Sequence, residues 1–204
     1  MAGQTIADRA ELVVVDSGST DGTLDIVRAA GVRLIEPFQD ERVACACGIP
    51  NAPDGGKLTR RFVQDYGHAR AYPFWGYSNS AGCFRADLWR EYPFREDMPG
   101  TEDKEWAWYW MQRDRLVVLD PAPMTDHSHT DEGPVTTFRR AQAEWEGFAA
   151  YLDLEPYTLG DTVRDWWTQL DGYPSPWRAR VGPRRMLRLL GRWRGRKNGW
   201  NLRR

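Results

Sequence analysis

Apolar runs of strand length alternate with helical periodicity over the first part of the chain. Residues 12–15 read Leu-Val-Val-Val, a run typical of a strand buried on both faces of a parallel sheet. A turn rich in Asp, Ser, Gly and Thr follows at 16–22, and apolar residues then recur at helical spacing up to Gly31, a residue that favours a helix end. Residues 32–35, Val-Arg-Leu-Ile, again fit a strand, so the pattern predicts a βαβ unit.

Later segments extend this α/β pattern. We expect strands at 43–49 and 116–119, and loops at 51–56 and 121–134. We also predict helices at 58–66 and 85–92, a Trp-rich helix at 102–113, a long amphipathic helix at 136–152, and a basic amphipathic helix from Pro183 onward. The chain of 204 residues is long enough for a real core. We place an α/β domain at residues 1–152 and a helical, Trp- and Arg-rich tail at 153–204.

Charge is divided unevenly between the tail and the rest of the chain. After Asp171 there are 11 basic residues and no acidic one, which leaves 17 of the 28 basic residues beside all 29 acidic ones in the preceding part. The tail fits three interpretations: a peripheral helix on an anionic membrane, a nucleic-acid patch, or a solvated helix packed by its leucines. Interleaved Trp and Arg favour the membrane surface, and no nucleic-acid motif accompanies the charge.

The cysteines and the apolar segments indicate a cellular location. Three cysteines are an odd number, and the Cys45-Ala-Cys47 spacing is too short for a zinc site, so we expect reduced, buried thiols in a cytosolic protein. Met1 opens no signal peptide, and no apolar run approaches the ~18 residues of a membrane span. The 11 tryptophans suit a core, a cleft or a membrane interface. We expect a cytoplasmic protein, peripheral on the inner face of the membrane.

The first candidate for chemistry is the run Asp-Ser-Gly-Ser-Thr-Asp-Gly-Thr at 16–23. Asp16 directly follows the strand predicted at 12–15, and a carboxylate there lies at the edge where open α/β sheets bind ligands. The small residues that follow allow close approach to the backbone, and a helix N-terminus favours anionic groups. The simpler interpretation is a strand-to-helix turn capped by Ser and Asp.

Two further runs carry polar chemistry. Glu102 and Asp103 follow Pro-Gly-Thr at the predicted start of a helix, where acids also serve as partners of the helix dipole. His127 and His129 lie in the loop at 121–134 and could share a metal only if the loop brings both nitrogens to it; otherwise they are solvated or pack under the next helix.

Together these runs resemble the family 2 glycosyltransferases of the GT-A type, in their rhamnosyltransferase-like branch, over most of residues 4–151. The resemblance rests on residues 13–23, on the Ser-Asn-Ser-Ala-Gly-Cys-Phe-Arg run at 78–85, on Pro-Phe-Arg-Glu at 93–96, and on 99–106. It implies a reduced, Rossmann-like three-layer sandwich with a mostly parallel sheet. It also implies transfer of a sugar from a nucleotide donor to a glycan or lipid-linked acceptor, with inversion.

The resemblance also assigns roles to single residues. Asp16 would contact the base of the nucleotide sugar, in a turn completed by Ser17, Gly18 and Asp21. Asp103 would be the catalytic base with Glu102 beside it, and Asn79 and Trp106 would lie at the acceptor. His127 would help to hold a divalent metal, Mg or Mn, which neutralises the leaving diphosphate.

Two family elements are missing from this chain. Residues 1–10 hold no strand of the kind with which members begin, and residues 37–42 stand where members carry a helix and a strand ending in an Asp-x-Asp motif. Asp40 and Glu41 precede a strand instead of ending one, so they do not replace that motif. Metal binding is then either lost or supplied by another segment or chain. The smaller sheet exposes an edge, which makes a homodimer one way to cover it.

Three function classes therefore remain. The first is a glycosyltransferase of polysaccharide biosynthesis. The second is a non-catalytic, glycosyltransferase-like module that binds a partner or a glycan. The third is a peripheral membrane adaptor that acts through residues 183–204.

Overall fold

The computed structural model describes residues 34–122, 132–168 and 182–199. They form two compact units, each described here by itself. The first consists of Met1–Pro93 and Trp106–His127, and the second of Phe94–Glu105 and Ser128–Arg204. The long helix expected to close the first domain belongs to the second unit, together with the tail helix.

A four-stranded mixed sheet is the centre of the first unit. Its strands are β1 (Val43–Gly48), β2 (Phe62–Gln64), β3 (Gly82–Phe84) and β4 (Leu116–Asp120), in the order β2-β4-β1-β3. The pair β1 and β4 is parallel, whereas β3 pairs with β1 and β2 pairs with β4 in antiparallel fashion. The α/β class is thus confirmed, but the described sheet is mixed and not mostly parallel. The strand expected at 12–15 lies outside the described residues.

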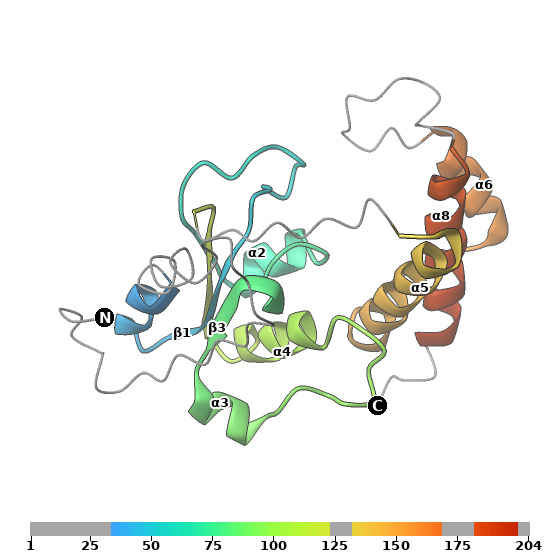
Figure 1. The fold of residues 1–204 in the computed structure, drawn as a ribbon. Helices are drawn as coiled ribbons and strands as arrows, with labels where there is room; N and C mark the ends of the chain where they lie inside the picture. The colour runs from blue at the N-terminus through green and yellow to red at the C-terminus, as the bar shows by residue number, and fades with distance from the viewer. Residues whose placement is uncertain (1–33, 123–131, 169–181, 200–204) are drawn as a thin grey trace, which may run out of the picture. The chain divides into compact units, whose positions relative to one another are not determined.

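Sequence explains why β1 and β4 are the inner strands. Val43 to Cys47 are all buried, as are Val117 to Asp120, so both strands are covered on both faces. Such strands need the continuous apolar runs that predicted them. In Figure 1, β1 and β3 run side by side, and β3 is a short edge strand of three residues.

The helices that precede or connect the strands are, in chain order, η2 (Glu36–Gln39), α2 (Tyr66–Ala71), η3 (Asn79–Ala81), α3 (Ala86–Glu91) and α4 (Glu102–Met111). The helix predicted at 85–92 and the one predicted at 102–113 are confirmed. The first turn of α4, Glu102 to Glu105, belongs to the second unit, and the rest to the first.

Two expected elements are wrong. The helix expected at 58–66 is instead the strand β2 followed by the start of α2. Asp65 separates them, because its Oδ1 accepts a hydrogen bond of 2.8 Å from the backbone N–H of His68 and so caps α2. A strand was expected at 32–35, but its two described residues, Leu34 and Ile35, are helical. Both apolar side chains are buried in this helical conformation.

Three helices build most of the second unit: α5 (Pro134–Tyr151), α6 (Leu159–Thr168) and α8 (Pro183–Gly199). They lie together in Figure 1, where α8 packs against both α5 and α6. The helices predicted at 136–152 and from Pro183 are confirmed. Within the described ranges, no helix is long and apolar enough to cross a membrane.

Three glycines of α8 form its contact with α5. A β-carbon at Gly191 would lie 2.6 Å from the carbonyl oxygen of Phe138, and one at Gly195 or Gly199 would collide with the carbonyl oxygen of Gln142 or Glu146. The spacing of four residues places the three glycines on one face, so the backbones approach closely along that face. Because the contacted positions rise together along both helices, α5 and α8 run in the same direction.

Candidate functional site

The predicted catalytic pair lies on the first turn of α4. Thr101, directly before it, has a left-handed backbone with a φ of 62°, and its carbonyl oxygen accepts the N–H of Glu105 at 2.9 Å. The Asp103 Oδ1 atom accepts the backbone N–H of Lys104 at 2.7 Å. Glu102, Asp103 and Glu105 all stand on this turn, where the exposed N–H groups of a helix favour negative charge.

This turn is held tightly against α5. A β-carbon at Gly147 would collide with the carbonyl oxygen of Gly100 and with the Thr101 hydroxyl, so only glycine allows this approach. From the other side, a β-carbon at Gly100 would lie 3.4 Å from the carbonyl oxygen of Ala143. A left-handed threonine costs about 1–3 kcal/mol and persists only where its surroundings fix it. The close contact with α5 supplies that constraint and so positions the carboxylates that follow.

Tyr151, one turn beyond Gly147 on α5, brings a phenol into this acidic environment. Burial raises the pKa of Tyr151 well above its ordinary value, and the negative charges of Asp103, Glu105 and Glu144 raise it further. The phenol is therefore neutral and can donate a hydrogen bond near three carboxylates. The site thus places a candidate base, Asp103, near a phenol that keeps its proton and can act as a hydrogen-bond donor without being a proton source.

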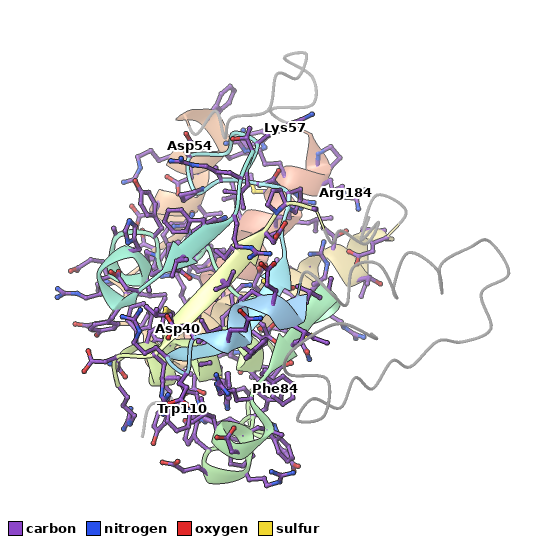
Figure 2. All side chains as sticks on the ribbon, turned by 90° about the vertical axis from the view of Figure 1, so that its left-hand side faces the viewer. Asp40, Asp54, Lys57, Phe84, Trp110 and Arg184 are labelled. Carbon is purple, nitrogen blue, oxygen red and sulfur yellow. The ribbon has the colours of Figure 1, made fainter. Side chains whose placement is uncertain are left out.

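The two predicted acceptor residues lie in the first unit and differ in exposure. Asn79, in η3, is exposed and can contact a ligand. Trp106 is 0% exposed, and its indole N–H donates to the carbonyl oxygen of Tyr92. Its ring packs against Phe84, at 5.7 Å between centroids, and against Trp110, at 6.1 Å. In this structure Trp106 is a core side chain with no surface for an acceptor; Phe84 and Trp110 are labelled in Figure 2.

A polar centre that the sequence reasoning missed lies where the parallel strands end. Asp120, the last residue of β4, pairs with Gly48 at the end of β1 and is only 2% exposed. Arg61 Nε donates to Asp120 Oδ2 at 3.0 Å, and Arg61 Nη2 donates to Glu36 Oε2 at 3.1 Å. Burial opposes the charge of Arg61, but the hydrogen bonds to both carboxylates hold its pKa above the ordinary value.

The loop after β1 closes over the same edge of the sheet. The backbone N–H of Ile49 donates to the carbonyl oxygen of Asp120 at 3.0 Å, so the loop starts beside that residue. Asn51 and Lys57 form an antiparallel bridge across the loop, and Trp75 Nε1 donates to the Asn51 carbonyl oxygen at 2.7 Å. Asp54 and Lys57 of this loop are labelled in Figure 2. This edge is the one at which open α/β sheets bind ligands.

The signal for Asp120 was present in the sequence. Residues 116–120 read Leu-Val-Val-Leu-Asp, which repeats the pattern Leu-Val-Val-Val-Asp at 12–16. An apolar strand followed directly by an aspartate predicts a carboxylate at the strand's carboxyl end, which the structure describes for Asp120; residues 12–16 lie outside the described residues. Arg61 gives no such signal, because it is 59 positions away from its partner.

The remaining predicted site residues lie outside the described residues. These are the nucleotide-turn residues Asp16, Ser17, Gly18 and Asp21, and the metal candidate His127. Within the ranges that the structure describes, no three His, Cys, Asp or Glu side chains are grouped so that they could hold a metal. The three cysteines are free thiols, and burial raises the pKa of Cys83.

Comparison of the chain with models of protein families, with curated proteins and with solved structures finds no match. The resemblance to the family 2 glycosyltransferases therefore stays a prediction from the sequence runs alone. Of these, the runs at 78–85, 93–96 and 99–106 lie in the described part of the chain.

Proposed function

We propose that this chain transfers a sugar from a nucleotide-sugar donor to the hydroxyl of a glycan or a lipid-linked acceptor, as a reduced member of the GT-A type. The observation that carries the proposal is the acidic first turn of α4. There Asp103 follows a strained Thr101 that is fixed against α5 at Gly147. A rigid support of this kind is what a general base needs, because proton transfer depends on geometry before pKa.

In the proposed reaction, Asp103 accepts the proton of the acceptor hydroxyl while that oxygen attacks the anomeric carbon of the donor. The bond between the anomeric carbon and the diphosphate oxygen breaks, and the nucleotide diphosphate leaves with the bonding electron pair. Attack from the face opposite the leaving group inverts the configuration. The neutral phenol of Tyr151 keeps a hydrogen-bond donor near the carboxylates of the turn.

The donor would bind at the turn that the sequence predicts for Asp16, Ser17, Gly18 and Asp21, with the base of the nucleotide on Asp16. A divalent metal, Mg or Mn, would neutralise the diphosphate, with His127 as its candidate ligand. The donor atoms of the described residues do not make a metal site by themselves. We therefore assign no step to the metal.

Replacement of Asp103 tests the proposed base. Asp103→Asn keeps the size of the side chain but removes its basicity, so transfer should fall by about 10²- to 10⁴-fold while affinity for the nucleotide diphosphate stays within about twofold. Asp153→Asn, an exposed carboxylate of the same unit, is the matched control and should leave both unchanged. Equal loss of affinity and transfer in Asp103→Asn would show that Asp103 supports the structure and is not the base.

The alternative is a glycosyltransferase-like module that binds without catalysis. The absence of the Asp-x-Asp motif from residues 37–42 favours it. The two functions separate in one experiment: the binding module retains affinity for a nucleotide or a glycan, yet consumes no donor in the presence of any acceptor.

We also propose that the protein associates peripherally with an anionic membrane. The helix α8 carries six arginines and one lysine and no acidic residue. Some of these cations turn inward: Arg192 Nη1 lies 3.8 Å from Asp165 Oδ2, and Arg196 donates to the carbonyl oxygen of Glu155. Arg188, Arg194 and Lys197 are exposed and are the residues that can face lipid.

A further inference from the structure

One face of α6 is apolar and exposed. Leu159 is 51% exposed, Val163 50% and Trp167 61%, and their spacing of four residues puts them in one line. At a rise of about 1.5 Å per residue, the line is about 12 Å long. The other side of α6 is buried: Thr162 is 1% and Asp165 2% exposed. We call these three exposed residues the α6 stripe.

The orientation of α6 is fixed by polar contacts on its buried side. The Tyr157 hydroxyl donates to Asp165 Oδ2 at 2.8 Å, and Arg185 Nη2 donates to the Asp165 carbonyl oxygen at 2.9 Å. At the start of the helix, Thr158 and Asp161 cap one another, with the Thr158 N–H donating to Asp161 Oδ2 at 2.8 Å. Because these contacts lock the helix, the stripe is an outward-facing surface of the second unit and not a frayed core element.

Charge around the stripe selects its partner. Arg164 follows Val163 directly, but its guanidinium is paired with Asp161 at 2.7 Å and with Asp165 at 3.3 Å, so the cations that attract lipid must come from α8. The neighbouring helix α8 has no acidic residue and supplies three exposed cations, Arg188, Arg194 and Lys197, one helix diameter of about 10 Å away. That distance is slightly more than the screening length of about 8 Å at physiological salt, so the attraction of α8 for the surface that the stripe contacts is reduced there and grows at lower salt. An apolar line ending in Trp on a cationic support suits the interface of an anionic bilayer, where indole rings are favoured.

A second copy of the chain fits the stripe less well. Two copies joined through the same face would gain no charge complementarity, because α8 has cations and no acidic residue on both sides. Three side chains also supply far less area than the roughly 800 Å² per partner of a stable interface.

We infer that Leu159, Val163 and Trp167 are the residues through which the second unit inserts into the surface of an anionic bilayer, with α6 lying along the membrane plane. This inference rests on the peripheral association proposed above, and it is independent of sugar transfer. In this inference, α6 inserts apolar side chains into the bilayer, and α8 supplies the electrostatic attraction to anionic lipid.

Sedimentation with vesicles of phosphatidylcholine, with and without phosphatidylglycerol, tests the assignment on the full chain. The triple variant Leu159→Gln, Val163→Gln, Trp167→Gln should bind anionic vesicles at least about tenfold more weakly than the wild type. Val135→Gln is the matched control, because Val135 is 60% exposed in the same unit but lies on α5, away from the stripe, and it should bind like the wild type. The double variant Arg188→Gln, Lys197→Gln changes only exposed cations and should also weaken binding to anionic vesicles.

Several results would overturn the inference. If the triple variant binds vesicles as the wild type does, the α6 stripe is not the inserting surface, although the peripheral association itself would stand. If the wild type binds both vesicle types equally, electrostatic attraction between α8 and anionic lipid does not contribute to binding. A wild-type dimer in the absence of lipid that the triple variant converts to a monomer would make the stripe a contact between copies. Failure of the wild type to bind either vesicle would overturn the peripheral association itself.

Discussion

The close packing of α8 on α5 gives the sharpest prediction about stability, through Gly195→Ala. A β-carbon at this position would collide with the carbonyl oxygen of Gln142, and it would lie 2.8 Å from the backbone nitrogen of Glu146 and 3.0 Å from Trp145 Cβ. Two of these atoms are backbone, so they cannot move aside without shifting the helix.

Two opposing effects set the size of the change. Alanine is a better helix former than glycine by about 1 kcal/mol in a helix interior. Overpacking of a close contact costs about 1–3 kcal/mol, and a contact with backbone belongs at the upper end of that range. We therefore expect Gly195→Ala to lower the free energy of unfolding by about 1–2 kcal/mol. For a chain of this length the melting temperature should fall by about 2–8 °C.

Gly160→Ala is the control, and urea and thermal unfolding are the assays. Gly160 lies in α6, where a β-carbon would meet only the Thr158 hydroxyl at 3.4 Å, so the same change should be neutral or stabilise by up to about 0.5 kcal/mol. If Gly195→Ala were as stable as Gly160→Ala, the glycine contact between α5 and α8 would be refuted.

Three further predictions concern other contacts. Arg61→Met leaves the buried carboxylate of Asp120 without its guanidinium partner and should lower the free energy of unfolding by about 1–3 kcal/mol. In a double-mutant cycle measured by urea unfolding, the further change Asp120→Asn should restore part of this loss. Burial and the hydrogen bond to Asp165 raise the pKa of Tyr157 to about 12. The pKa of this phenol is higher in the folded chain than in the unfolded chain, where it is near 10, so the protonated phenol stabilises the fold fully below pH 10 and less and less as the pH rises toward 12. In unfolding experiments at increasing pH, Tyr157→Phe should not show this loss of stability. Gly147→Ala should displace the acidic turn of α4 and lower transfer without changing the affinity for nucleotide.

The elements best predicted from the sequence were those with an unambiguous period. The buried strand predicted at 116–119 and the amphipathic helices α5 and α8 follow directly from their apolar spacing. The segment at 58–66 misled because Phe62 and Val63 fit either period, and only the capping by Asp65 and the pairing with β4 decide for a strand. The parallel pairing of β1 with β4 connects segments some 70 residues apart along the chain, as Gly48 and Asp120 show, and no local pattern encodes it.

Long-range geometry also limited the prediction of the site. The acidic turn was found from sequence, but its support, the contact of Gly100 and Thr101 with Gly147, depends on two helices meeting. Trp106 looked like an acceptor contact by resemblance, and its complete burial is visible only once Phe84 and Trp110 surround it. The tail was correctly predicted as a basic helix, but the inward turn of Arg192 and Arg196 depends on Trp145 and Tyr157, between which Arg192 lies at 4.2 and 4.5 Å from the ring centroids.

Binding of a nucleotide diphosphate tests the central proposal most directly. We would titrate the full chain with UDP and with dTDP in the presence of Mn, following the heat of binding, and repeat the titration with Asp16→Asn. The proposal predicts binding of at least one nucleotide below millimolar concentration, weakened by Asp16→Asn. Absence of binding of both nucleotides at millimolar concentration would contradict the assignment of this chain as a glycosyltransferase.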